Sequence, residues 1–269
     1  MDMEKLTVIK VGGKIVEEED DLNRFLADFS QIEGYKLLVH GGGRLATKVA
    51  NQLGIESRMV EGRRITDAET LKVVTMVYAG WVNKMIVARL QALGINAVGL
   101  TGADMNVIRS VKRPVQAIDY GFVGDIEEVD ARRLAMLLQQ DIVPILSPLT
   151  HDKQGTLLNT NADTIAAETA LSLAKSFEVT LIYCFEKSGV LRDEQDEKSV
   201  IPLIDKDMFM KFKEQGVIHG GMIPKLENAF RAIDAGVKRV VITKASGIQS
   251  NKGTLLQNFF KLLINTDNN

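Results

Sequence analysis

The chain has 269 residues, of which 25% are charged and 45% are hydrophobic, and its formal net charge at pH 7 is −2. This length suits one large α/β domain or two fused lobes and allows a sizeable core. The near-neutral charge excludes the broad basic surface that binds nucleic acid or anionic membranes, so we expect neither partner.

The chain starts with MDMEKLTVIK, which lacks the apolar region of a secretory signal. No run approaches 18 consecutive apolar residues, so a membrane-spanning segment is not expected. Cys184 is the only cysteine and lies in an apolar stretch. Without an internal disulfide partner it fits a reducing compartment and is expected to be buried and inert. We therefore expect a soluble, cytoplasmic protein.

Short apolar runs alternate with helical patterns along the whole chain. The runs are continuous rather than alternating, which is typical of parallel strands covered on both faces. The predicted strands are 5–11, 35–40, 96–100, 141–147, 179–185 and 239–244. The predicted helices are 20–32, 44–53, 66–92, 130–139, 161–176, 205–215 and 223–236. This alternation predicts an α/β fold, a three-layer αβα sandwich with an open, mainly parallel central sheet.

The longest predicted helix, 66–92, has an apolar stripe along one side. Thr66 and Glu69 have the spacing of a capping box, so Thr66 is the expected N-cap. The stripe follows at spacings of three and four: Leu71, Val74, Tyr78, Trp81, Met85 and Ala88. Two interpretations stay open, packing on the sheet or pairing with the same helix of a second copy in a homodimer.

Residues 104–128 alternate apolar and polar positions between turn signals, which predicts hairpins at a sheet edge or a β-rich flap. No linker or internal repeat is visible, so 1–269 is expected to form a single domain. A fresh βα series begins near residue 178, which divides it into an N-terminal lobe of about 1–178 and a C-terminal lobe of about 179–269.

Two predicted strands run directly into glycines, in IKVGGK (9–14) and LLVHGGGRL (37–45). Carboxyl ends of parallel strands meet at one sheet edge, where α/β proteins bind ligands. Glycines let the backbone approach a ligand, and their N–H groups can surround phosphate oxygens. Because Lys10 lies just before one of them, the two glycine loops together favour a phosphate-binding pocket over two plain strand-to-helix turns.

The second loop also fits a dinucleotide-binding pattern. Gly41, Gly43 and Ala46 satisfy G-x-G-x-x-G/A, and Glu61 lies 20 residues beyond Gly41. The loop follows the second strand instead of the first, however, which weighs against a nicotinamide-dependent oxidoreductase. A Walker A loop and the catalytic and DFG motifs of protein kinases are absent from the sequence. A nucleotide site here must be of another design.

Two later segments have matching chemistry. LLNTNAD (157–163) places Asn159, Asn161 and Asp163 at a strand-to-helix junction, where Asn161 is the expected N-cap and Asp163 suits the positive helix end. HGGMIPK (219–225) places Lys225 at a helix start after a glycine pair, an arrangement that can deliver a cation to a ligand.

Seven motifs in order, IKVGGK, LLVHGGGRL, EGRRIT, GFVGDI, LLNTNAD, EKSGVL and GGMIPK, with a closing GT at 253–254, resemble the amino-acid kinase family over essentially the whole chain. The resemblance implies ATP-dependent phosphoryl transfer to the γ-carboxylate of an N-acylated glutamate, the second step of arginine biosynthesis. It also implies Mg²⁺ held mainly through the nucleotide phosphates, with no metal ligands assigned in the chain. Acetyl, succinyl and aminoadipate-derived acceptors stay open, as does a non-catalytic nucleotide-binding protein of the same fold.

The resemblance also implies roles for individual residues. Lys10 and Lys225 contact the transferring phosphoryl group from opposite sides, and Asp163 positions both lysines. Substrate-binding positions are Gly42, Gly43, Arg64 and Asn159, with Arg63 a competitor for Arg64. Nucleotide-binding positions are Gly12, Gly13, Glu186, Lys187, Ser188, Gly189, Val190, Leu191, Val217, Ile218 and His219. Because few residues precede the first strand, we expect an arginine-insensitive homodimer joined through helix 66–92.

Overall fold

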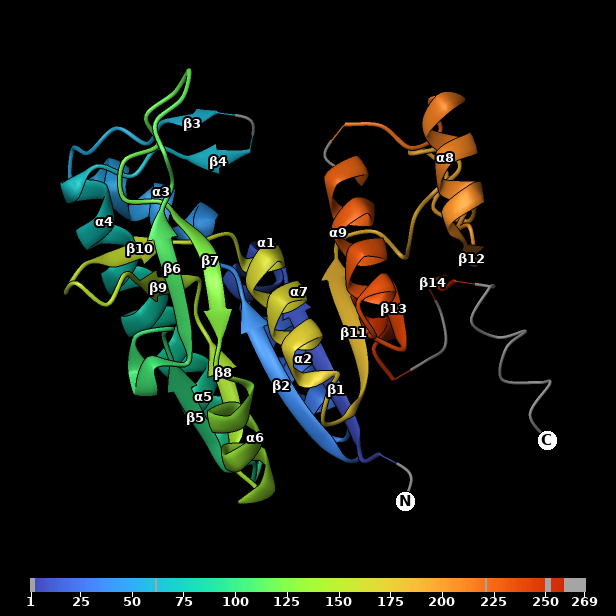
Figure 1. The fold of residues 1–269 in the computed structure, drawn as a ribbon, viewed down its shortest axis with the longest axis horizontal. Coiled ribbons are helices and arrows are strands. Elements are labelled where there is room, and N and C mark those ends of the chain that lie inside the picture. Colours follow the sequence, from blue (N-terminus) through green and yellow to red (C-terminus); the bar gives the residue numbers. More distant parts are fainter. Residues whose placement is uncertain (1–2, 61, 221, 250–252, 259–269) are drawn as a thin grey trace.

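The computed structural model describes residues 3–60, 62–220, 222–249 and 253–258 (Figure 1). Among them a central sheet has eight strands: β1 (Lys5–Val11), β2 (Tyr35–His40), β5 (Ala97–Leu100), β8 (Val143–Leu146), β11 (Glu178–Phe185), β12 (Leu203–Ile204), β13 (Arg239–Lys244) and β14 (Thr254–Leu256). Their order is β12-β14-β13-β11-β1-β2-β8-β5. Only the β13–β14 pairing is antiparallel within this described sheet, so the predicted mainly parallel sheet is confirmed.

Helices cover both faces of this sheet, as the αβα prediction requires. Their bounds are α1 (Gly13–Glu17), α2 (Glu19–Ser30), α3 (Gly43–Gln52), α4 (Ala68–Thr75), η1 (Met76–Val82), α5 (Asn83–Ala92), η2 (Asp104–Asn106), α6 (Ala131–Gln139), α7 (Ala162–Leu173), α8 (Lys206–Glu214), α9 (Met222–Asp234) and η3 (Ala245–Gly247). In Figure 1, α7 crosses the front of β1, α9 lies in front of the sheet near β11 and β13, and α2 lies behind. Two buried clusters, one on each face, form the hydrophobic core.

Alternation along β1 decides which way its polar residue points. Leu6 and Val8 belong to the cluster on the α7 side, whereas Ile9 and Val11 belong to the other cluster. Because successive strand residues face opposite sides, Lys10 continues the α7 series. It is the last residue of that series before the glycines, so its ammonium group reaches the upper edge of the sheet beside the start of α7.

A second sheet flanks the first with the order β10-β9-β6-β7. It contains β6 (Ile108–Lys112), β7 (Gly124–Val129), β9 (Leu149–His151) and β10 (Leu157–Asn159). The antiparallel pairing of β6 with β7 confirms the hairpin expected in 104–128. A two-stranded hairpin joins β3 (Met59–Val60) to β4 (Arg63–Arg64); like β9, β10, β12 and β14, it was not predicted, because each strand is too short for a recognisable pattern.

The start of helix 66–92 differs from the prediction. Asp67, not Thr66, is the N-cap of α4, and its Oδ1 accepts a hydrogen bond from the Thr70 N–H at 2.7 Å. Thr66 is fully buried and its hydroxyl donates to the Arg64 carbonyl. The capping-box assignment was therefore wrong, because a neighbouring aspartate is an equally good cap.

The apolar stripe of this helix also differs from the prediction. Its middle, η1, is a π-helix, whose wider turn shifts the buried face by one position. After Tyr78 the buried apolar residues are Val82, Ile86 and Leu90. Trp81 is instead 64% exposed. Part of the predicted stripe thus faces away from the sheet.

By length and composition alone, the helix Ala68–Ala92 could cross a membrane, although continuous apolar runs did not predict one. Core helices of soluble proteins also have this length and composition, so the two criteria are weak evidence for a membrane span. Here 39% of the apolar window is buried inside the molecule.

Candidate active site

The two glycine loops meet at the carboxyl edge of β1 and β2, as predicted. The Gly12 N–H donates to the Cys184 carbonyl at 3.2 Å and the Gly41 N–H donates to the Val11 carbonyl at 3.0 Å. A Cβ added at Gly41 would lie 3.1 Å from the backbone nitrogen of Gly13. Two main chains approach so closely here that any side chain at Gly41 would force them apart.

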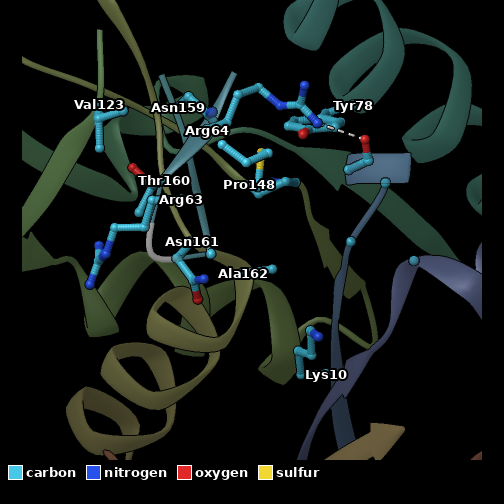
Figure 2. A pocket seen from close by; sticks show the side chains of 16 residues that line it. Lys10, Arg63, Arg64, Tyr78, Val123, Pro148, Asn159, Thr160, Asn161 and Ala162 are labelled. Atoms are coloured by element: carbon cyan, nitrogen blue, oxygen red, sulfur yellow. Dashed lines mark hydrogen bonds between the residues drawn. The ribbon is translucent and has the colours of Figure 1, made fainter. Parts of the chain in front are cut away.

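Two cavities share this edge. The first, shown in Figure 2, is lined by Lys10, Gly13, Gly41, Gly42, Gly43, Met59, Gly62, Arg63, Arg64, Tyr78, Val123, Pro148, Asn159, Thr160, Asn161 and Ala162. The second is lined by Lys10, Gly12, Gly13, Lys14, Ile15, Gly43, Arg44, Phe185, Glu186, Lys187, Gly189, Met222 and Lys225. They have Lys10, Gly13 and Gly43 in common. A group held in one cavity can therefore meet a group held in the other beside the ammonium of Lys10.

Lys10 forms an ion pair with Asp163, whose Oδ1 lies 2.8 Å from the Lys10 Nζ. Both side chains are mostly buried, with exposed fractions of 10% and 15%. Asp163 is in the first turn of α7, where the side chain of Asn161 accepts a hydrogen bond from the Thr164 N–H at 3.1 Å. The predicted Asn161 cap is confirmed, and it fixes the turn that presents Asp163 to Lys10.

Lys225 reaches the same place from α9. Its Nζ lies 3.9 Å from the ring centroid of Phe185, and the Lys10 Nζ lies 5.2 Å from the same centroid. The two nitrogens are therefore no farther apart than the sum of these distances. Desolvation lowers the pKa of Lys225, and the charge of Lys10 lowers it further, whereas Asp163 opposes both effects. Of the glycine pair before this helix, Gly221 lies outside the described residues.

Arg64 is buried against the second glycine loop. Its Nη2 donates to the Gly43 carbonyl and to the Thr47 hydroxyl, and its Nη1 donates to the Ser57 hydroxyl, each at 2.8 Å. Figure 2 shows this guanidinium beside the ring of Tyr78, at the far end of the cavity from Lys10. A cation is thus fixed at the end of the cavity away from Lys10.

Arg63 and Asn159 line the same cavity. Adjacent strand residues point to opposite sides, and Figure 2 shows Arg63 and Arg64 leaving β4 in different directions. The amide of Asn159 donates to the Thr66 hydroxyl at 3.0 Å, so that donor is already engaged inside the protein. Both positions stay predicted substrate contacts.

The predicted nucleotide positions divide into two groups. Gly12, Gly13, Glu186, Lys187 and Gly189 line the second cavity. The others do not line either cavity in the described structure: Ser188, Val190, Leu191, Val217, Ile218 and His219. Several of these pack in the core instead, including Val190, Leu191 and Ile218. Their roles stay predictions.

The loop at 186–191 is anchored by the closing GT motif. The Thr254 hydroxyl accepts a hydrogen bond from the Val190 N–H at 2.8 Å and donates to the Ile201 carbonyl at 2.7 Å. A Cβ added at Gly189 would lie 2.7 Å from that hydroxyl. Glycine at this position lets the loop close over the end of β11.

Among the cavity-lining residues that sequence reasoning missed, four are charged or aromatic. Lys14 and Arg44 each follow a glycine pair directly, a signal that could have identified them; both contact Glu186, at 3.1 and 3.3 Å. Tyr78 lies against Gly42, where an added Cβ would be 3.1 Å from its ring. Phe185 had only the pattern of a buried strand residue, which concealed its position below two lysines.

The predicted character of Cys184 is confirmed. Its thiol is fully buried on the face of β11 opposite Phe185, and burial raises its pKa to about 12. It is therefore protonated and unreactive at neutral pH.

Comparison with known proteins identifies the family. The model of the amino acid kinase family matches residues 5–244. The chain belongs to this family. Among its relatives, acetylglutamate kinase of Phocaeicola vulgatus is 71% identical over 254 residues, covering 94% of this chain and 99% of the relative. Acetylglutamate kinase of Methanopyrus kandleri is 39% identical, covering 94% of this chain and all of the relative.

Solved structures show the same amino acid kinase fold. N-acetylglutamate synthase from Neisseria gonorrhoeae superposes with a TM-score of 0.80 at 23% identity, covering 96% of this chain and 60% of the other. Carbamate kinase from Giardia lamblia bound to AMP-PNP superposes with a TM-score of 0.70 at 14% identity, covering 96% of this chain and all of the other. At these identities the likeness concerns the fold alone.

Proposed function

We propose that the protein is an acetylglutamate kinase, which transfers the γ-phosphoryl group of ATP to the γ-carboxylate of N-acetyl-L-glutamate. The observation that carries the proposal is the meeting of two cavities at Lys10, Gly13 and Gly43, with Lys225 in the second cavity and Arg64 in the first. Relatives of that name at 71% identity over almost their whole length support it.

The chemistry needs positioning and positive charge more than proton transfer. A carboxylate oxygen of the acceptor attacks the γ-phosphorus, the bond from that phosphorus to the β,γ-bridging oxygen breaks, and ADP leaves with the electron pair. The acceptor is already ionised at neutral pH, so no general base is required. Charge spreads over the three equatorial oxygens, where Lys10, Lys225 and the glycine N–H groups can stabilise it.

The charges of the site suit two anionic substrates. The first cavity, here called the acceptor cavity, has Lys10 at one end and Arg64 at the other. This matches the two carboxylates of N-acetylglutamate. The Nη2 of Arg64 already donates to Gly43 and Thr47, so Arg64 would bind the α-carboxylate through its charge and its remaining N–H groups. This would direct the γ-carboxylate towards Lys10. The second cavity, the donor cavity, is lined by Glu186, whose carboxylate could help to hold Mg²⁺ together with the ATP phosphates. No three acidic, histidine or cysteine side chains gather as a metal site among the described residues.

Trapping the product tests the function directly. The protein is incubated with MgATP, N-acetyl-L-glutamate and hydroxylamine, which converts an acyl phosphate into a coloured hydroxamate. We expect hydroxamate only when both substrates are present, and none above background with Lys10→Met. ATP consumption that does not depend on the acyl amino acid, or no product at all, would contradict the proposal.

N-succinyl-L-glutamate is a second candidate acceptor because of Arg63. This second arginine lines the acceptor cavity beside Arg64, and succinyl adds a third carboxylate to the substrate. The ratio of kcat/KM for the two acceptors would distinguish them. If succinyl is the physiological group, Arg63→Leu lowers kcat/KM for succinylglutamate much more than for acetylglutamate. An equal decrease in kcat/KM for both acceptors would leave acetylglutamate as the substrate.

We further propose a cytoplasmic homodimer joined through helix 66–92. The exposed apolar side chains Met76 and Trp81, at 55% and 64%, support a partner surface on η1. Light scattering coupled to size exclusion would test this, with Trp81→Glu expected to produce monomers and Met210→Glu, on exposed α8, expected to leave the dimer intact. A wild-type monomer at micromolar concentration would rule the dimer out.

A further inference from the structure

Phe185 lies beneath both lysines of the site. The structure assigns it a role as a positioning residue: the face of its ring holds the ammonium groups of Lys10 and Lys225 where the two cavities meet. The distances of 5.2 and 3.9 Å from the ring centroid are both within the range of cation–π attraction. This inference rests on the proposed phosphoryl transfer.

The strand register explains how one ring reaches two lysines. Lys10 on β1 is the parallel partner of Tyr183 on β11. Phe185 is two residues farther along β11 and therefore lies on the same face, one step closer to the sheet edge. That face is covered by α7 and α9, and α9 provides Lys225 (Figure 1). The ring thus lies below both lysine ammonium groups, at the base of the site, and we call it the aromatic floor.

The ring is held from below by a second aromatic residue. Tyr183 and Phe185 stack with centroids 6.0 Å apart and ring planes within 8° of parallel. Tyr183 is fully buried, and its hydroxyl donates to the backbone carbonyl of Asp163 at 3.3 Å. The same stack therefore contacts the helix turn that pairs with Lys10, so the aromatic floor and the acidic partner are fixed relative to each other.

An aromatic floor suits this site better than a second carboxylate. Two ammonium groups repel each other, and Asp163 is the carboxylate paired with Lys10. Another acid below Lys225 would neutralise the charge that the phosphates need. A ring face attracts both cations and orients them but adds no net charge. The positive charge of the pair stays available to the nucleotide.

Fluorination of the ring tests this without changing its shape much. Phenylalanine with one, two or three fluorines, inserted at position 185 through a suppressed stop codon, progressively withdraws charge from the ring face. We expect kcat for acyl phosphate formation to fall stepwise, by roughly three- to tenfold for the trifluoro ring. KM for acetylglutamate should stay nearly constant. The same series at Phe209, a buried ring near Lys213 on α8, should leave kcat unchanged.

Three kinetic outcomes would overturn the inference. Equal kcat across the series would mean that the ring only fills space. A rise in kcat would mean that the ring competes with the phosphates for the lysines. A change confined to KM for ATP would place the ring against the nucleotide. In each case the wild type still forms acyl phosphate, so the proposed function is not affected.

A measurement without turnover separates the two proposals. An aromatic face shifts the proton resonances of groups above it upfield. We expect upfield Lys225 ε-methylene resonances in the wild-type protein and a return towards random-coil positions in Phe185→Leu, with Phe209→Leu as the control. If the wild type lacks the shift, the inference fails even if the protein is a kinase. If the shift is present but no acyl phosphate forms, the proposed function fails instead.

Discussion

The Nζ of Lys10 and the Oδ1 of Asp163 lie 2.8 Å apart and join the end of the first strand to the first turn of α7. Both side chains are mostly buried, so each charge is stabilised by the other. Placed together, they fix one ammonium group at the boundary of two cavities. This relationship makes the functional proposals testable one residue at a time.

Removal of either lysine should reduce turnover strongly. We expect Lys10→Ala and Lys225→Ala each to lower kcat by roughly 10²–10³, by analogy with loss of one oxyanion donor. Initial rates of hydroxamate formation at saturating substrates measure this. Lys213→Ala, which removes a partly exposed lysine that pairs with Glu227 on the surface, is the control. A loss smaller than about threefold in either variant would remove that lysine from the mechanism.

Arg64→Lys should behave as a severe change in spite of the conserved charge. One ammonium cannot replace a planar guanidinium that already donates to Gly43, Thr47 and Ser57 and must also bind a carboxylate. We expect KM for the acyl amino acid to rise about tenfold or more, with KM for ATP little changed. A KM for the acceptor equal to that of the wild type would show that Arg64 does not hold the substrate.

The alkaline limb of the pH profile should report Lys225. Its pKa is lowered from the ordinary 10.5, mainly by desolvation. Because the charged form is the active one, kcat/KM for ATP, which reports the free enzyme, should fall as pH rises through this lowered pKa. The Lys225→Arg variant stays positively charged over the same pH range. It should therefore not show this alkaline decrease, although its overall rate is lower. Identical alkaline limbs in the two proteins, measured as kcat/KM for ATP from pH 7 to 10.5, would exclude Lys225 as the titrating group.

His40 should make the folded protein sensitive to acid. It is fully buried between Gly41 and Asn83, with its Nδ1 2.9 Å from the Gly41 carbonyl, and burial lowers its pKa from 6.5 to about 4. Above 6.5 the ring is neutral in both states. Below it the unfolded chain binds a proton that the folded protein does not, so stability falls, by roughly 2 kcal/mol at about pH 5.

Urea unfolding at neutral and acidic pH measures this loss. His40→Gln should lose less free energy of unfolding than the wild type between about pH 7 and pH 5, by roughly the same 2 kcal/mol. His219→Gln, which changes an exposed histidine, should follow the wild type. Parallel losses in all three proteins would assign the acid sensitivity to other groups.

Local patterns were sufficient for the elements that form the sheet edge. Strands at 5–11, 35–40 and 239–244 have the predicted bounds, since short runs dominated by apolar residues have few alternatives in a parallel sheet. The glycine loops and the Asn161 cap follow from backbone requirements that only a few residue types meet. Lys10, Asp163, Arg64 and Lys225 were identified through the order of motifs in a family rather than from any one of them.

Long-range packing decided the rest. The π-helix at Met76–Val82 moved Trp81 to the surface, because one additional residue in a turn changes the face of everything after it. Phe185 had the pattern of an ordinary strand residue, and its place below two lysines depends on the register of β11 with β1 and on the position of α9. The sequence by itself therefore determined the elements, the edge and the charged groups available there. Only the tertiary structure decided which of those groups meet, because contacts between distant segments depend on register and helix packing that no local pattern contains.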